Sequence, residues 1–118
     1  MFALPGGPIY LARAPVDLRK SIDGLSVLVS QVLQQDPFSR QLFIFINRRR
    51  DKLKALSWDQ NGFVLYYKRL ERGRFPWPAI DAGQSALVIE ARQLQWLLSG
   101  LSIEQRQALP VVSAQVVA

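Results

Sequence analysis

The chain has 118 residues, of which 49% are hydrophobic, so it is long enough for one folded domain with its own core and too short for two. It contains no cysteine and no histidine, which excludes disulfides, thiolate nucleophiles, zinc–thiolate sites and the commonest general base. Its formal net charge of +6 favours a polyanionic partner, although an anionic membrane surface would also satisfy it.

The N-terminal part predicts a short strand and no membrane anchor. After an irregular lead-in rich in proline and glycine, Ile9–Ala12 has the composition of a strand and is expected to join the sheet. No apolar run of about twenty residues could span a bilayer, and the first residues lack the features of a signal peptide. The expected location is therefore cytoplasmic, without a membrane partner.

An amphipathic helix is predicted next. It begins at Asp17, a suitable N-cap, and ends at Asp36, because Pro37 disfavours helical geometry at the residue before it. The spacing of its apolar residues is typical of one helix face. These residues are Leu18, Ile22, Leu25, Leu28, Val29, Val32 and Leu33.

A glycine and two cations lie at positions of this helix where they are unfavourable. Gly24 weakens a helix interior, so it indicates either close packing against the sheet, which we expect, or a tolerated weakness. Arg19 and Lys20 would lie in the first turn, where the helix dipole disfavours cations. Pairing with Asp23 would offset this effect, and a bound phosphate is the alternative.

Three further strands are expected to form an antiparallel meander. They cover Leu42–Ile46, Lys52–Trp58 and Phe63–Leu70, and the first is apolar on both faces and so central. The segment Asp59–Gly62 contains Asn-Gly and predicts a hairpin. Whatever its loop length, side-chain alternation places one set of residues on a single face. This set is Lys52, Lys54, Leu56, Trp58, Phe63, Leu65, Tyr67 and Arg69.

Nearly all the excess positive charge lies between Arg40 and Arg74, where ten Lys or Arg residues stand against three acidic ones. The meander would bring the cationic ends of its last two strands, the arginine loop 48–50 and the arginines after the last strand to one end of the sheet. Cations neutralise phosphates, and nearby Tyr or Trp rings stack on unpaired bases, so this pattern favours a nucleic-acid surface. The alternative is a solvated basic loop.

The segment Arg72–Pro78 alternates cations with aromatic residues and prolines, and it is expected to be stiff and extended. Trp77 in this segment could dock on a partner. Alternatively, Phe75 and Trp77 close the bottom of the core, and the sequence leaves both interpretations open. The following residues, Ala79–Ser85, are expected to form a loop.

The C-terminal part predicts a strand over Ala86–Ile89 and a helix from about Ala91, which Gly100 interrupts or caps. One face of this helix would carry Leu94, Leu97, Leu98 and Leu101. A last short helix over Ile103–Leu109 would end at Pro110.

Together these elements predict one α+β domain over residues 1–109, followed by a poorly ordered tail over residues 110–118. An antiparallel sheet of four to five strands would carry the first helix on one face and the second helix near its edge. The strand order does not follow from the sequence.

Several of these segments resemble the TnpB accessory proteins of IS-sixty-six-type bacterial insertion sequences, over most of residues 9–105. The segments that carry the resemblance are Asp17–Leu25, Phe43–Phe45 with the basic loop after it, Asp51–Lys54, Trp58–Asp59 and Gly62–Phe75. The chain departs from the family at Leu18, where Met is common, at Ser57, where an aromatic residue is common, and in the tail after Leu109.

The resemblance implies a small protein that is encoded beside a separate, larger transposase and is needed for transposition. It implies no catalytic residues. The RNA-guided nucleases that share the TnpB label are several times longer and carry acidic catalytic sites and zinc motifs that this chain lacks.

The first functional hypothesis is a non-enzymatic accessory factor for DNA transposition that binds DNA and assists the transposase, without a cofactor or metal. Its cations would contact phosphates, and one or both of its aromatic residues would stack on bases. The predicted nucleic-acid-binding residues are Arg48, Arg49, Arg50, Lys52, Lys54, Lys68, Arg69, Arg72, Arg74, Tyr66 and Trp77.

Two alternatives belong to other classes. The first is a protein-interaction module that uses Phe75, Trp77 and the exposed parts of the helices to grip the transposase or another copy of itself, without binding DNA. The second is a metal-dependent nuclease that uses Asp51, Asp59 and Glu71 to hold Mg²⁺. Each of these acids also has a simpler role, as a counter-charge, a turn residue or a salt-bridge partner.

Overall fold

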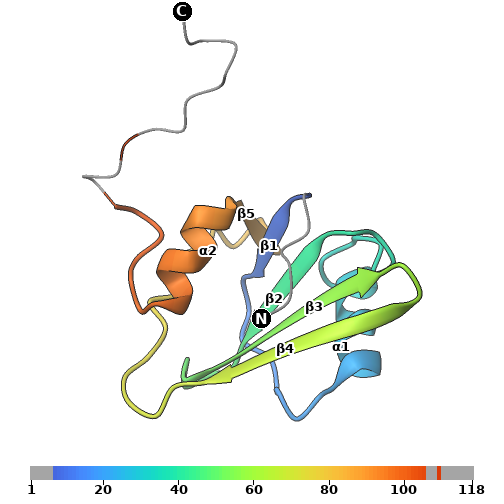
Figure 1. Cartoon of the computed structure of the whole chain (residues 1–118), viewed down its shortest axis with the longest axis horizontal. Helices are drawn as coiled ribbons and strands as arrows, with labels where there is room; N and C mark the ends of the chain where they lie inside the picture. The colour runs from blue at the N-terminus through green and yellow to red at the C-terminus, as the bar shows by residue number, and fades with distance from the viewer. Residues whose placement is uncertain (1–6, 106–108, 110–118) are drawn as a thin grey trace, which may run out of the picture.

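The computed structural model describes residues 7–105 and residue 109, and within them lie five strands and two helices (Figure 1). The strands are β1 (Ile9–Ala12), β2 (Leu42–Ile46), β3 (Lys52–Asp59), β4 (Gly62–Arg69) and β5 (Ala86–Ile89). The helices are α1 (Ile22–Gln31) and α2 (Ala91–Leu98). These elements confirm the predicted α+β class and all five predicted strands, whereas the predicted tail lies outside the described residues.

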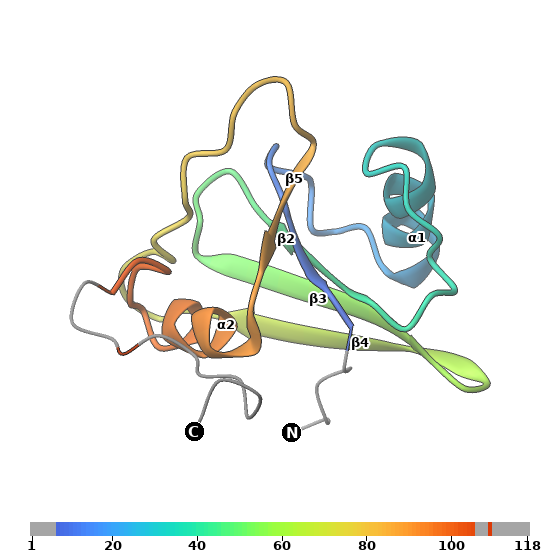
Figure 2. The same cartoon turned by 90° about the horizontal axis from the view of Figure 1, so that it is seen from above.

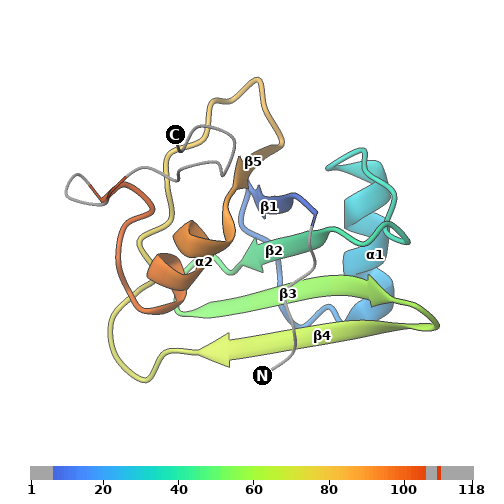
Figure 3. The same cartoon turned by 45° about the horizontal axis from the view of Figure 1, so that its top comes forward.

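The strands form one sheet in the order β4-β3-β2-β1-β5 (Figure 3). β2 lies at the centre and all five of its side chains are buried, as its uniformly apolar sequence predicts. β1 runs parallel to β2, whereas the other three strand pairs are antiparallel. The expected antiparallel pairing therefore holds for three pairs, and the segment that contains α1 supplies the crossover that the parallel pair requires.

Helix α1 is shorter than predicted at its start. Its N-cap is Ser21 and not Asp17, because the carboxylate of Asp17 accepts a hydrogen bond from the backbone N–H of Arg19 (3.0 Å) and forms a local turn. Arg19 and Lys20 consequently precede the helix, and Arg19 pairs with Asp17 rather than with Asp23. Leu18 is nevertheless buried, because the turn directs it towards the sheet.

The other end of α1 also differs from the prediction. The helix ends at Gln31, before the expected stop at Asp36, and Gln34 adopts a left-handed φ of 54° that cannot continue a helix. A Cβ atom on Gly24 would lie 3.1 Å from the Cβ of Lys20. Gly24 therefore permits close packing against the Lys20 side chain, and not against the sheet as expected.

The two faces of the sheet carry separate cores, and α1 and α2 lie on opposite sides of it (Figure 2). Leu25 and Val29 of α1 pack with Phe43 and Phe45 of β2. The α2 core lies on the other face and includes Leu94 and Leu97 of α2 with Leu42, Ile44 and Ile46 of β2. Helix α2 therefore covers a face of the sheet, where the sequence suggested a place near its edge.

Phe75 and Trp77 belong to the α2 core. Phe75 is 1% exposed and Trp77 is 7% exposed. The indole N–H of Trp77 donates a hydrogen bond to the carbonyl of Ala12 (3.0 Å), which ties the segment after β4 to the end of β1. Of the two interpretations of these rings, closure of the core is therefore correct, and neither ring is available as an anchor for a partner.

The β3–β4 hairpin confirms the predicted face. Asp59 pairs with Gly62, so the loop consists of two residues, and the first of them, Gln60, has a φ of 51°. The cross-strand pairs on the α1 face are Lys52–Arg69, Lys54–Tyr67, Leu56–Leu65 and Trp58–Phe63. This register places cations at one end of the hairpin and aromatic residues at the other.

Helix α2 begins at Ala91 as predicted, and Gly100, with a φ of 83°, follows its C-cap. Leu101 is 47% exposed, so the prediction that it shares the buried face was wrong. Residues 103–105 are not helical, and most of the predicted last helix lies outside the described residues. In the part of the chain that the structure describes, neither helix has the length and apolar character to cross a membrane.

Candidate nucleic-acid interface

The loop between β2 and β3 carries three consecutive arginines and is held from within by Asn47. The side chain of Asn47 accepts a hydrogen bond from the backbone N–H of Lys52 (3.0 Å) and donates one to the carboxylate of Asp51 (2.6 Å). The backbone N–H of Arg50 donates to the carbonyl of Asn47 (3.0 Å), which closes the turn. With these bonds made inside the loop, the three arginine side chains at 48–50 are exposed to solvent.

The segment after β4 is hydrogen-bonded to the same loop. The backbone N–H of Leu70 donates to the carbonyl of Asp51 (2.8 Å), and the N–H of Phe75 donates to the carbonyl of Arg50 (2.7 Å). Burial of Phe75 fixes the second of these contacts. The exposed arginines between residues 70 and 75 are therefore held beside the arginine loop.

These segments together form a cationic surface, which we call the basic end. Lys52 lies opposite Arg69 in the β3–β4 pair, so both strands contribute to it. Its members are Arg48, Arg49, Arg50, Lys52, Arg69, Arg72 and Arg74. The predicted convergence of distant cations at one end of the sheet is thus confirmed.

Two lysines that we expected on this surface hold elements of the fold together instead. The ammonium group of Lys54 donates to the carbonyl of Lys20 (3.0 Å) and lies 5.3 Å from the centre of the Tyr67 ring. The ammonium group of Lys68, on the opposite face of the sheet, donates to the carbonyl of Leu98 at the end of α2 (2.7 Å). We therefore leave both out of the basic end.

The aromatic residues chosen from the sequence, Tyr66 and Trp77, lie on the α2 face of the sheet and not with Lys52 and Arg69 on the α1 face. Tyr66 is partly buried and packs against the α2 core, which also contains Trp77. The aromatic side chain that accompanies the cations is instead Tyr67, which is 50% exposed on the α1 face. Side-chain alternation along β4 places Tyr67 on the same face as Lys52 and Arg69. The sequence therefore contained a signal that identifies Tyr67 as the aromatic residue of this surface.

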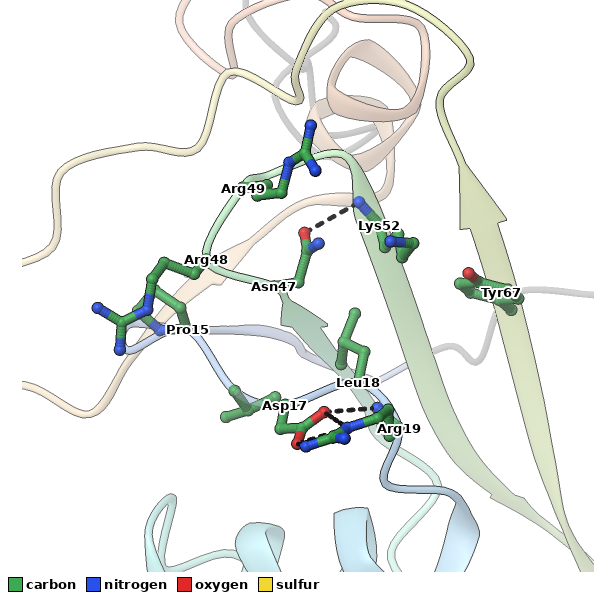
Figure 4. Close-up of a pocket in the computed structure, with 10 residues that line it drawn as sticks. Pro15, Asp17, Leu18, Arg19, Asn47, Arg48, Arg49, Lys52 and Tyr67 are labelled. Atoms are coloured by element: carbon green, nitrogen blue, oxygen red, sulfur yellow. Dashed lines mark hydrogen bonds and ion pairs between the residues drawn. The ribbon is translucent and has the colours of Figure 1, made fainter.

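A pocket of about 480 Å³ opens at the basic end on the α1 face (Figure 4). The segment before α1, the arginine loop and the open end of the β3–β4 hairpin form its walls. Its lining residues are Pro15, Val16, Asp17, Leu18, Arg19, Asn47, Arg48, Arg49, Lys52 and Tyr67. Arg19 enters the site because the turn at Asp17 replaces the first turn of the predicted helix.

The charge of the pocket is positive. Four of its lining residues are cations, and Asp17 is its single carboxylate. The guanidinium of Arg19 forms an ion pair with Asp17 (2.6 Å), and this hydrogen bonding lowers the pKa of Asp17 to about 2. Asp17 therefore stays ionised and paired at neutral pH, and Arg48, Arg49 and Lys52 supply the net charge.

The acidic residues of the hairpin region do not lie together in one cluster of three. Asp51 accepts a hydrogen bond from Asn47, which lowers the pKa of Asp51, and Glu71 forms an ion pair with Arg69 (3.0 Å). Over residues 7–105 and 109, no three acidic side chains gather where they could hold a metal ion together. Asp51 and Glu71, two of the three acids on which the hypothesis of a metal-dependent nuclease rests, therefore have partners within the fold, as the simpler interpretation of these acids expects.

The fold and this surface define a small α+β protein with a cationic end. The chain matches the family described as IS66 Orf2 like protein over residues 7–108 and belongs to that family. This match confirms the resemblance drawn from the sequence and gives the chain an accessory role associated with transposition.

Two relatives from Sinorhizobium fredii are similar over most of their length. The protein described as "Uncharacterized protein y4hO" is 38% identical over 101 residues, which are 83% of this chain and 86% of the relative. "Uncharacterized protein y4jC" is 35% identical over 103 residues, or 87% of this chain and 86% of the relative. No solved structure matches the chain.

Replacing Asn47 by alanine is expected to loosen the arginine loop, because two side-chain hydrogen bonds are lost. The free energy of unfolding should fall by about 1–2 kcal/mol in urea titrations. The pKa of Asp51 should rise towards its ordinary value in an NMR titration of the carboxyl carbons. Asn61→Ala, in the exposed hairpin turn, is the matched control, and an unchanged pKa of Asp51 in the Asn47 variant would contradict this role.

Proposed function

We propose that the protein is a non-catalytic accessory factor that binds DNA through the basic end and assists a separate transposase at the ends of the insertion sequence. Family membership supports the association with transposition, and the basic end supports DNA as the direct partner. Arginine and lysine side chains on such a surface contact phosphates and release condensed counterions.

The observation that carries this proposal is the convergence of cations from separate segments onto one surface. The cations of the loop, of β3, of β4 and of the segment after β4 lie together because backbone hydrogen bonds connect these segments. Among the described residues, Arg69 is the member of the basic end that forms an ion pair. In an incidental basic loop, cations from three other segments would not lie beside it. The unpaired charges suit a polyanion.

Neutralising Arg48 and Arg49 together is expected to weaken DNA binding and its salt dependence. The variant Arg48→Gln/Arg49→Gln should lower the magnitude of the slope of log K against log salt concentration by about 2, because each lost phosphate contact removes about 0.9. Fluorescence anisotropy with a labelled duplex from the insertion-sequence end, and with a scrambled duplex, measures both quantities. Preference for the end sequence would add recognition of the ends to phosphate binding.

The control variant Arg40→Gln/Arg92→Gln removes the same charge outside the basic end. Arg40 precedes β2, whereas the arginine loop follows it, and Arg92 lies on α2. Equal losses of affinity in the two double variants would show that total charge, and not the basic end, governs binding. Parental protein that binds neither duplex at low salt would contradict the proposal.

The second candidate function is contact with the transposase or with another copy of the chain. Phe75 and Trp77, the aromatic anchors expected from the sequence, are in the core, but an aromatic cluster lies at the turn end of the hairpin. Phe38 is 58% exposed, and its ring centre lies 5.1 Å from that of Trp58 and 5.5 Å from that of Phe63. Exposed aromatic residues that pack on one another are typical anchors of protein interfaces.

Phe38→Ser should reduce co-purification with the transposase several-fold while it leaves DNA affinity unchanged, because the hairpin separates Phe38 from the basic end. Val88→Ser, which changes an exposed apolar residue on β5, is the control. Undiminished co-purification of the Phe38 variant would remove the aromatic cluster from the interface.

A further inference from the structure

The pocket at the basic end differs from the rest of that surface because it is concave and part of its lining is apolar. Pro15, Val16 and Leu18 supply apolar surface, and Tyr67 forms one side wall. Figure 4 shows Tyr67 on β4 at one side of the pocket, Arg48 at the opposite side and Leu18 between them. A flat cationic patch would need neither the apolar lining nor the ring.

The Tyr67 ring contacts its neighbour across the strand pair. Lys54 lies opposite Tyr67, and its ammonium group is fixed by the carbonyl of Lys20 (3.0 Å) while it lies 5.3 Å from the ring centre. This cation–π contact favours the observed position of the ring, and Tyr67 remains 50% exposed. A ring in this state offers a stacking surface without a large loss of conformational entropy on binding.

The cations of the pocket suit a phosphate group. Because Arg19 neutralises Asp17, no unpaired carboxylate among the lining residues opposes an anion. Arg48, Arg49 and Lys52 line the same pocket as Tyr67 and form no ion pair within the described residues. Cations that can bind a phosphate and a ring that can stack on a base thus line the same cavity.

The shape of the pocket selects among nucleic-acid forms. A duplex presents its phosphates on a convex exterior and keeps its bases stacked inside, so its bases cannot reach into a concave pocket. A volume of about 480 Å³ falls within the range of pockets that enclose small ligands, and it can admit one base with its sugar and phosphate. The pocket therefore fits an unpaired nucleotide.

We propose that this pocket binds one unpaired nucleotide of a DNA strand, with the base on Tyr67 and a neighbouring phosphate on Arg48, Arg49 and Lys52. The inference rests on the proposed DNA-binding function and adds a preference for DNA with an unpaired segment. A free mononucleotide shares this chemistry. The cations of the basic end outside the pocket favour a strand, because they can bind its flanking phosphates.

The test compares three labelled DNAs by fluorescence anisotropy: a blunt duplex, the same duplex with a short single-stranded overhang, and the single strand. The parental protein should bind the overhang duplex about 10-fold more tightly than the blunt duplex, which is the scale of one stacked base. Tyr67→Leu should abolish this preference and leave blunt-duplex affinity unchanged. Tyr67→Phe, which keeps the ring, should retain the preference.

Two further variants separate the pocket from the surface around it. Arg72→Gln/Arg74→Gln lies outside the pocket and should weaken binding of blunt and overhang duplexes by the same factor. Arg49→Gln changes an exposed loop residue that lines the pocket, so it should reduce the overhang preference, and it keeps the inference testable if Tyr67→Leu does not fold.

The outcomes distinguish this inference from the proposed function. A preference for the overhang that survives Tyr67→Leu, or no preference in the parental protein, overturns the pocket as a nucleotide site but leaves duplex binding intact. Failure to bind any of the three DNAs overturns the proposed function itself. Displacement of the overhang duplex by deoxyadenosine monophosphate at equal concentration would assign the pocket to a free nucleotide and overturn the assignment to a strand.

Discussion

The rest of the structure depends on one constraint: β2 is apolar on both faces and lies at the centre of the sheet. Burying such a strand requires a cover on each side, because every exposed apolar face has a free-energy cost in water. The crossover segment provides α1 for one face, and the segment after β4 provides Phe75, Trp77 and α2 for the other. Trp77, which the sequence suggested as an anchor for a partner, is therefore part of the core.

This constraint also creates the cationic surface. Because Phe75 must reach the α2 core, the chain after β4 turns back past the arginine loop, and backbone hydrogen bonds hold the two segments together. The cations between them cannot be buried and remain in solvent. The turn end of the same hairpin carries Trp58 and Phe63. The charged and the aromatic surfaces thus lie at opposite ends of one hairpin, which would allow contacts with DNA and with a protein to coexist.

Patterns of period two made the sheet and its surface predictable. Alternation predicted the face shared by Lys52 and Tyr67, and the apolar run predicted the central strand. The sequence could not show that Lys68 would reach the end of α2, because these residues are far apart in the chain. It also could not show that Asp17 would bond to Arg19, because the same residues fit the pattern of a helix capped by Asp17. The pocket was not predicted either, because its walls come from segments that meet only in the folded chain.

The most direct test of DNA binding at the basic end is to map the contact surface by NMR. Backbone amide chemical shifts of the isotope-labelled protein would be followed as a short duplex is added at low salt. The largest shifts are expected in residues 47–52 and 69–74, with little change at the hairpin turn, residues 59–62, or in α2. Shifts concentrated at the hairpin turn or in α2, or no shifts at all, would contradict the assignment of DNA binding to the basic end.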